Sequence, residues 1–338
     1  MRRVRFGRGG RGDGKQFDGK PIPETARVRA WQGARARGCP GSAQGILWRA
    51  RTAAADTPDG SCAMGLTSLK NITGAMDRDQ LLKRYQSGRG QGVREGWKPW
   101  LTVREVKSRG QSCVEVGSIV QRPYELLGRL EWKAFLAAER LRGVTDIREQ
   151  YPLWPLESTE AIADELSVRH PQVPKSPHKS LMTTDLVLTT DWPDEPVVPI
   201  YVKYASDLGK RRTQEKLDIE TGWWAACGAR LRVVTELELP DTLGNNLKQM
   251  HACRTVTPET LGTVELEDVE AAFLAALRKA PAAPANVLSH GVDKALGLDA
   301  GVCLTVFWHM ASTRRLRIDL MAPFVPTDPF RLLPAREA

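Results

Sequence analysis

Long apolar segments are missing from this sequence of 338 residues. No run approaches the roughly 18 consecutive apolar residues that a membrane-spanning helix needs. The arginine-rich start also lacks the apolar stretch of a secretory signal peptide. We therefore expect neither a membrane-spanning helix nor a secretory signal.

Cysteine pairs with metal-binding spacing are missing as well. None of the six cysteines belongs to a CxxC pair, and no histidine pair accompanies them, which argues against a zinc site. The cysteines lie far apart in the sequence: Cys39, Cys62, Cys113, Cys227, Cys253 and Cys303. We therefore expect a reduced, intracellular protein.

A recognisable phosphate-binding loop is the third absence. The glycines of segment 88–110 have neither the GxGxxG nor the Walker spacing, and no predicted strand precedes them. The same segment carries Trp97 and Trp100 on either side of Pro99. Such a pair either stacks on nucleic-acid bases or anchors a loop to its domain, and we favour the anchor.

Positive charge is concentrated at the start of the chain. Residues 1–64 hold 13 Lys and Arg against 5 Asp and Glu, which accounts for +8 of the net charge of +9. Their Gly-, Arg- and Ala-rich composition predicts a disordered arm over 1–75. This arm is interpreted as a nucleic-acid tether, as a dispensable tail or as sequence upstream of a later start such as Met64 or Met76, and we favour the latter two.

Periodic patterns between residues 76 and 236 predict an α/β domain. We expect helices over 76–86, 129–142, 158–167 and 211–227, and extended segments over 113–121, 144–154, 181–189, 197–204 and 230–235. From residue 129 onward, apart from one loop excursion, the order is αβββαβ. This is the common core of restriction-endonuclease-like nucleases, although fold alone does not establish function.

The remaining residues, 237–338, have a different pattern. We expect helices over 241–252, 257–261, 266–279 and 289–297, followed by strands over 302–309 and 315–320. Helices followed by a two-stranded hairpin are typical of a winged-helix-type domain. Because this segment has no strong basic stripe, we expect it to bind a protein partner and not DNA.

Two of the predicted strands each contain a charge where a buried strand normally has none. Asp185 interrupts 181–189 and Lys203 interrupts 197–204. A buried charge costs several kcal/mol unless it is paired, so such residues are often functional. An internal salt bridge between the two is the structural alternative.

An acid, a lysine and a basic helix close in sequence suggest metal-dependent phosphodiester hydrolysis. Hard cations such as Mg²⁺ prefer oxygen ligands, and a lysine can orient the attacking water or neutralise developing charge. Nucleases commonly place an acid two residues before that lysine, where Tyr201 stands here. Tyr201 offers only its backbone carbonyl, so the second carboxylate is expected from Glu131 or, as a second candidate, Glu220.

Three basic residues lie in the predicted helix 211–227. Arg211, Arg212 and Lys216 are candidates for contacts with DNA phosphates. The same side chains could instead form pairs within the helix with Glu215. The sequence does not separate these two interpretations.

The wider motif pattern resembles the TnsA family, the endonuclease subunits of heteromeric Tns-type transposases. The resemblance covers about residues 80–338 and is looser toward the C-terminus, where FWHMAS and RIDL carry it. The other motifs are GRGQG…WKPWL (88–101), the helix entry Gly128-Arg129-x-Glu131, DIREQYPL (146–153), MTTDLVL (182–188), VK (202–203), RRTQEKLDIE…WW (211–224) and VVTE (233–236).

The resemblance implies a restriction-endonuclease-like catalytic domain with Glu131, Asp185 and Lys203 as catalytic residues. It also implies a Mg²⁺ site, which Mn²⁺ could fill, with Asp185, Glu131 and the carbonyl of Tyr201 as ligands. Family members usually have glutamine at the position of Tyr201, so tyrosine departs from the family pattern there.

The function implied by the resemblance is hydrolysis of the non-transferred (5′) strand at transposon ends during cut-and-paste transposition. The implied partners are transposon-end DNA, a DDE-type TnsB-like transposase and a TnsC-like AAA+ ATPase that docks on the C-terminal domain. The implied location is the bacterial cytoplasm, at the nucleoid during activity. The alternatives are a stand-alone restriction or repair nuclease and a catalytically silent architectural subunit.

Overall fold

The structure is a computed structural model that describes residues 78–106, 111–173 and 176–333. The predicted disordered arm, residues 1–75, lies outside the described residues. Within the described ranges, no helix is both long and apolar enough to cross a membrane.

A four-stranded sheet forms the centre of the first part of the chain. Its strands, in spatial order, are β3 (Val144–Pro152), β4 (Thr183–Thr190), β5 (Val197–Val202) and β6 (Arg232–Val234). The pairs β3–β4 and β4–β5 are antiparallel, whereas β5–β6 is parallel. A parallel pair requires a crossover connection, which here consists of α6 (Ala205–Leu208) and α7 (Arg211–Ala226).

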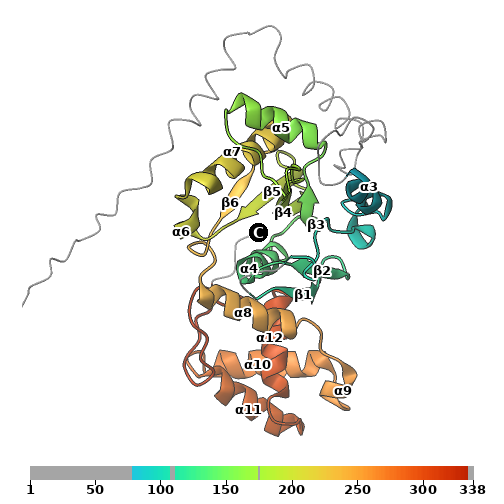
Figure 1. Ribbon diagram of the computed structural model, residues 1–338. Helices are drawn as coiled ribbons and strands as arrows, with labels where there is room; N and C mark the ends of the chain where they lie inside the picture. Colours follow the sequence, from blue (N-terminus) through green and yellow to red (C-terminus); the bar gives the residue numbers. More distant parts are fainter. Residues whose placement is uncertain (1–77, 107–110, 174–175, 334–338) are drawn as a thin grey trace, which may run out of the picture. The chain divides into compact units, whose positions relative to one another are not determined.

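Each face of this sheet is covered by helices. On one face α7 packs beside α5 (Leu156–Glu165), where Ile162, Trp223 and Trp224 form a common core with the sheet (Figure 1). The described order from residue 129 is therefore helix, strand, helix, strand, strand, two helices and strand. This order contains the predicted αβββαβ series, with α5 and the short α6 as additional helices.

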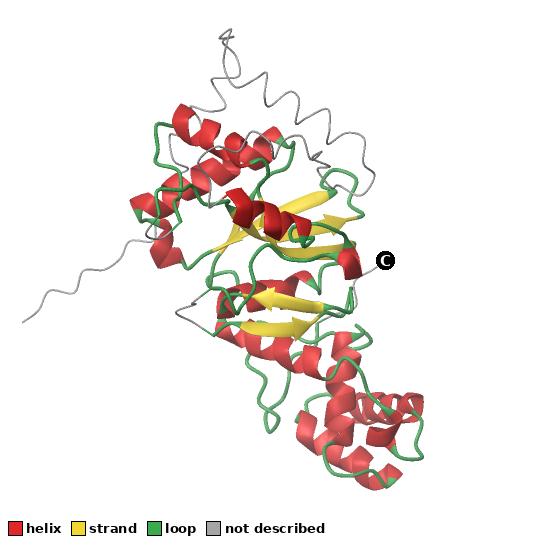
Figure 2. Cartoon of the chain, turned by 45° about the vertical axis from the view of Figure 1, so that its right-hand side comes forward, coloured by secondary structure: helices red, strands yellow, loops and turns green. Residues whose placement is uncertain are grey.

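The other face of the sheet packs against α4 (Arg129–Ala138), with Phe135 among the buried residues. A small antiparallel sheet of β1 (Cys113–Val116) and β2 (Pro123–Leu126) lies beside α4 (Figure 2). The sequence predicted one extended segment over 113–121, so β2 was missed.

The tryptophan-containing loop is anchored to the edge strand β3. This loop follows α3 (Arg78–Gln86), and the exposed fractions of Trp97 and Trp100 are only 4% and 1%. The Trp97 indole N–H donates to the carbonyl of Glu149 at 3.2 Å, and the Trp100 N–H donates to the carbonyl of Gln150 at 3.2 Å. The interpretation of this pair as a loop anchor is confirmed.

Glycine at position 90 permits this anchoring. We expect Gly90→Ala to lower the free energy of unfolding by about 1–3 kcal/mol. Gly90 has a φ of +69°, and a Cβ there would lie 2.4 Å from Cγ of Pro152, a ring that cannot move aside. Chemical denaturation measures the loss. Gly96→Ala is the matched control, since no atom lies within 4 Å of its added Cβ. Equal losses for the two variants would contradict the explanation.

The C-terminal part is helical where the sequence predicted a hairpin. Its helices are α8 (Asp241–Ala252), α9 (Pro258–Leu261), α10 (Leu266–Lys279), α11 (Ala285–Leu296) and α12 (Val302–Ser312). The predicted strand 302–309 is therefore wrong. The predicted strand 315–320 is reduced to a single bridge, between Ile318 and Leu332. The described residues thus contain no wing, and the winged-helix prediction is corrected to a helical domain.

The reason lies in the surroundings of α12. Its residues are apolar and rich in β-formers, but Val306, Phe307 and Met310 are buried together among the other C-terminal helices. A short apolar run cannot be distinguished from a buried helix by its periodicity alone. A side chain of the preceding helix also caps α12: the carboxylate of Asp293 in α11 accepts from the N–H groups of Gly301 and Cys303, each at 2.8 Å.

Candidate active site

Asp185 lies in β4 and is held by the neighbouring strand. Its Oδ2 accepts a hydrogen bond of 2.7 Å from the backbone N–H of Val202 in β5. Burial raises the pKa of Asp185, while this hydrogen bond and the charge of Lys203 act in the opposite direction. Removing the carboxylate from water thus outweighs the favourable contacts, so the site favours a proton or cation at Asp185.

Glu131 reaches the same place from the first turn of α4. Its Oε2 accepts hydrogen bonds from the N–H of Leu127 at 2.9 Å and from the side-chain amide of Gln150 at 3.3 Å. Burial raises the pKa of Glu131, and the negative charge of Asp185 raises it further. The structure therefore brings together two carboxylates that lie 54 positions apart in the sequence.

Lys203 directly follows β5 on the same side of the site. Its backbone N–H donates to the carbonyl of Val234 at 3.1 Å, which fixes the residue against β6. Its positive charge lowers the pKa of both Glu131 and Asp185, so the ammonium group lies near both. In the described part of the chain, however, no ion pair within 4.0 Å joins Lys203 to Asp185. The salt-bridge alternative is thus not the observed arrangement.

Glu220 of α7, the second candidate for the missing carboxylate, is buried and lies against β4. It has an exposed fraction of 1% and accepts a 2.7 Å hydrogen bond from the hydroxyl of Thr184. That hydroxyl in turn accepts a hydrogen bond from the indole of Trp224 at 2.7 Å. Burial raises the pKa of Glu220 well above its ordinary value, and Asp185 raises it further. Glu220 is thus a second buried carboxyl group close to Asp185, and the site favours its protonated form.

Tyr201 stands next to these carboxylates. Burial raises the pKa of its phenol, and the charges of Asp185 and Glu220 raise it further. The phenol therefore stays protonated at neutral pH and offers no negative oxygen to a cation. Any ligand from this position has to be the backbone carbonyl.

The oxygen donors of the site fit a hard cation such as Mg²⁺ better than a softer metal such as zinc. Among the described residues, no three His, Cys, Asp or Glu side chains form a cluster that could enclose a metal. Magnesium commonly uses only one or two protein carboxylates and completes its shell with water and substrate phosphate. Glu131 and Asp185 supply two such carboxylates. Their pKa values are raised because their negative charges are unfavourable in this buried site, and a bound cation would stabilise them.

The three predicted DNA contacts lie on the first two turns of α7. Arg211 and Arg212 both bond to Glu215, at 2.9 Å and 2.8 Å, so the intrahelical pairs are present. The Arg211 side chain is nonetheless 94% exposed. The pKa of Lys216 is lowered by burial and by the positive charges of Arg212 and Lys203, which places Lys216 near the catalytic lysine candidate.

Comparison with known proteins gives two adjacent family matches. Residues 142–236 match the model described as TnsA-like endonuclease N terminal, and residues 238–320 match TnsA endonuclease C terminal. The chain is 35% identical over 176 residues to Transposon Tn7 transposition protein TnsA of Escherichia coli. The chain belongs to the TnsA family. The match covers 52% of the chain and 63% of that relative.

The TnsA matches contain two of the three predicted catalytic positions. Asp185 and Lys203 lie within the N-terminal match, whereas Glu131 precedes its first residue. The link of Glu131 to the TnsA site therefore rests on the geometry described above. The sequence interpretation missed Gln150 and Thr184, although both belong to motifs that carried the resemblance, DIREQYPL and MTTDLVL.

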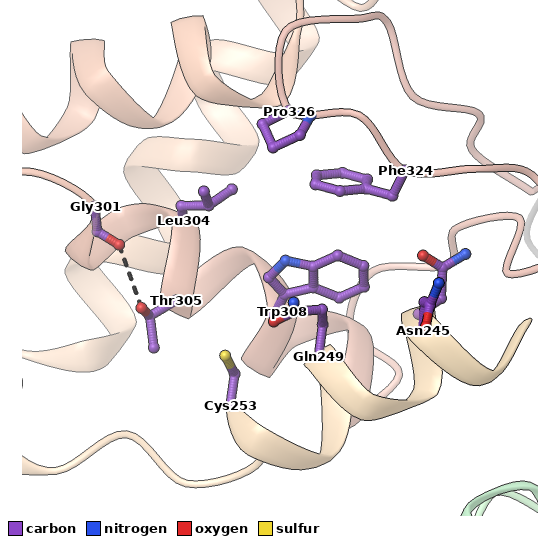
Figure 3. A pocket seen from close by; sticks show the side chains of 10 residues that line it. Asn245, Gln249, Cys253, Gly301, Leu304, Thr305, Trp308, Phe324 and Pro326 are labelled. Atoms are coloured by element: carbon purple, nitrogen blue, oxygen red, sulfur yellow. Dashed lines mark hydrogen bonds between the residues drawn. The ribbon is translucent and has the colours of Figure 1, made fainter. Parts of the chain in front are cut away.

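A pocket of about 340 Å³ lies elsewhere in this TnsA-family chain, between α8 and α12 (Figure 3). Trp308 and Phe324 form apolar walls, and Asn245 and Gln249 add amide groups. None of the predicted site residues lines it. The carboxylate site is therefore distinct from this pocket.

Proposed function

We propose that this chain is the metal-dependent DNA endonuclease subunit of a transposase, which hydrolyses the non-transferred (5′) strand at transposon ends. The observation that carries the proposal is the meeting of Glu131, Asp185 and Lys203 at one end of a mixed sheet in a TnsA-family chain. We further propose that the αβββαβ core is of the restriction-endonuclease type.

In this proposal Glu131, Asp185 and the carbonyl of Tyr201 hold Mg²⁺, for which Mn²⁺ can substitute. When bound, the ion polarises the scissile phosphate and lowers the pKa of a coordinated water. Lys203 orients the attacking water and neutralises charge on the phosphate. Glu220, bonded to Thr184, supports β4 next to Asp185. Arg211, Arg212 and Lys216 contact the DNA backbone near this site.

The partners in this proposal are a DDE-type TnsB-like transposase, which cuts the transferred strand, and a TnsC-like AAA+ ATPase. In this proposal the ATPase docks on the C-terminal helical part, which contains the second family match, residues 238–320. The substrate is transposon-end DNA, and the reaction takes place in the bacterial cytoplasm.

The test is strand-specific nicking of a labelled transposon-end duplex with Mg²⁺ and both neighbouring transposition proteins. We expect wild type to cut the 5′ strand and Lys203→Ala to cut it about 10²–10³-fold more slowly, as when one charge-stabilising group is removed. Cutting of the transferred strand is expected to persist. Lys83→Ala, which removes an exposed lysine of α3, serves as the control.

Two results would contradict this proposal in different ways. Equal 5′-strand cutting by wild type and Lys203→Ala would place the active site elsewhere. Efficient cleavage of transposon-end DNA by the purified chain without partners would instead indicate a stand-alone nuclease.

A further inference from the structure

Gln150 has a backbone conformation that is unusual for its position. Its φ is +48°, in the left-handed region, where a residue with a side chain is disfavoured. Among the described non-glycine residues with positive φ, it is the one inside a strand; the others are Arg94, Ser167 and Arg314. Such backbone strain persists only where the surrounding structure enforces it, and it often marks a functional position.

The strain changes which face of β3 the following residues occupy. Ile147 is buried in the core with α4, whereas Tyr151 packs in the core with α7 and α5. These residues are four positions apart, so a regular strand would place them on one face. The partner strand changes face at the same level: Leu186 joins the α4 core, but Thr184 bonds to Glu220 and Trp224 of α7. Gln150 and Asp185 therefore lie where the alternation of both strands is broken.

The side chain of Gln150 is held at both ends. Its Oε1 accepts a hydrogen bond from the hydroxyl of Thr183 at 3.2 Å, and its Nε2 donates to Oε2 of Glu131 at 3.3 Å. Its backbone carbonyl accepts from the N–H of Trp100 at 3.2 Å, and the residue is only 2% exposed. Because Thr183 occupies the amide oxygen, the NH₂ group is directed at Glu131.

We propose that Gln150 is a positioning residue, which holds the Glu131 carboxylate in the orientation needed for cation binding and DNA cleavage. This inference rests on the proposed function. Both hydrogen bonds that reach Glu131 from Gln150 and Leu127 end on Oε2, which leaves Oε1 available to a ligand. The neutral amide of Gln150 orients the carboxylate and leaves its negative charge in place. A lysine at position 150 would instead neutralise that charge.

This role also connects two sequence motifs that the catalytic residues leave unexplained. DIREQYPL supplies Gln150, and WKPWL supplies Trp97 and Trp100, which bind the carbonyls of Glu149 and Gln150. The tryptophan loop thus holds the strained peptide in place. The strained peptide in turn aims the amide at Glu131.

The decisive variant is Gln150→Asn. Asparagine tolerates the left-handed conformation better than glutamine, so the fold should be retained. Its side chain is one methylene shorter and cannot span from Thr183 to Glu131. We expect kcat for 5′-strand nicking to fall about 10–100-fold with little change in KM for DNA, and Mn²⁺ affinity without DNA to fall by a similar factor. Single-turnover kinetics and Mn²⁺ titration by electron paramagnetic resonance measure these quantities.

Two further variants separate positioning from general structural support. Thr183→Val removes the hydroxyl that orients the amide, so we expect a smaller loss in the same direction. The double variant should be no worse than Gln150→Asn alone, because both changes break one chain of contacts. Ser167→Asn is the matched control, since Ser167 also has a positive φ, +53°, at the end of α5. It should leave kcat and Mn²⁺ affinity unchanged.

The outcomes distinguish this inference from the proposed function. Suppose that Gln150→Asn keeps the wild-type kcat and Mn²⁺ affinity while Lys203→Ala shows its expected slow cutting. This result would overturn the role of Gln150 and leave the proposed function standing. A loss of kcat matched by a large fall in Tm would also overturn it, in favour of a structural role. If wild type fails to nick DNA with its partners, the proposed function fails. Crystal structures would then decide the inference, because Glu131 should keep its orientation in wild type and lose it in Gln150→Asn.

Discussion

Replacing Asp185 by asparagine is expected to reduce 5′-strand cleavage at least about a thousandfold while preserving the fold. A bound metal ion contributes several kcal/mol of transition-state stabilisation, and about 4 kcal/mol corresponds to a thousandfold in rate. Asparagine keeps an oxygen that can accept the hydrogen bond from Val202. It cannot supply the negative charge on which cation binding depends.

The same substitution is expected to stabilise the metal-free protein, by an amount that depends on pH. The pKa of Asp185 is raised in the folded state, so the folded state binds a proton more tightly than the unfolded chain does. Wild type therefore loses stability as pH rises through and above the ordinary aspartate pKa. Asparagine does not titrate, so Asp185→Asn should be more stable than wild type by about 1–2 kcal/mol near pH 8, and by less near pH 4.

Nicking assays and chemical denaturation at the two pH values test both parts of this prediction. Asp191→Asn serves as the control, because Asp191 is an exposed residue just after β4. An Asp185→Asn variant that cuts like wild type would show that the carboxylate is dispensable. A variant less stable than wild type near pH 8 would show that the carboxylate is structural.

Removing Arg122 is expected to cause a large loss of stability, because it leaves a buried carboxylate without its partner. The guanidinium of Arg122 and the carboxylate of Glu149 pair at 2.5 Å, with side-chain exposed fractions of 5% and 0%. Arg122 also donates to the carbonyl of Ile147 at 2.8 Å and lies 3.7 Å from the ring centre of Tyr124. Arg122→Met would leave Glu149 buried without its partner, at a cost of about 3–5 kcal/mol.

Urea denaturation measures the free energy of unfolding that Arg122→Met removes. The comparison is with the loss caused by breaking an exposed ion pair. Arg129 and Asp241 are 3.2 Å apart with exposed fractions of 48% and 70%, so Arg129→Met should cost less than about 1 kcal/mol. Combining Arg122→Met with Glu149→Gln should recover part of the loss, because no buried charge remains unpaired. Suppose that Arg122→Met lowers the free energy of unfolding no more than Arg129→Met does. The burial of the Arg122–Glu149 pair would then not add to the stability that the pair provides.

Local patterns in the sequence predicted most elements of the nuclease part. Apolar periodicity located α4, β3 and the strand pair β4–β5, because each has one face or both faces in a core. The unusual charges of Asp185 and Lys203 identified those strands as functional candidates. Both signals depend on residues near one another in sequence, which is why a single sequence is enough to read them.

Contacts between distant residues decided what the patterns could not. Residues 302–309 form a helix because surrounding helices bury them and Asp293 caps their first turn. Glu220 is buried because the fold places α7 against β4, where Glu220 bonds to Thr184.

The sequence by itself determined the order of elements, the residue types available for chemistry and the resemblance to the TnsA family. The tertiary structure decided that Glu131 meets Asp185, that Glu220 is buried and that Gln150 adopts a left-handed backbone in a strand. The physical reason is that hydrophobic periodicity and turn preference act along the chain. Burial, electrostatic repulsion and enforced backbone strain arise only when distant segments pack together.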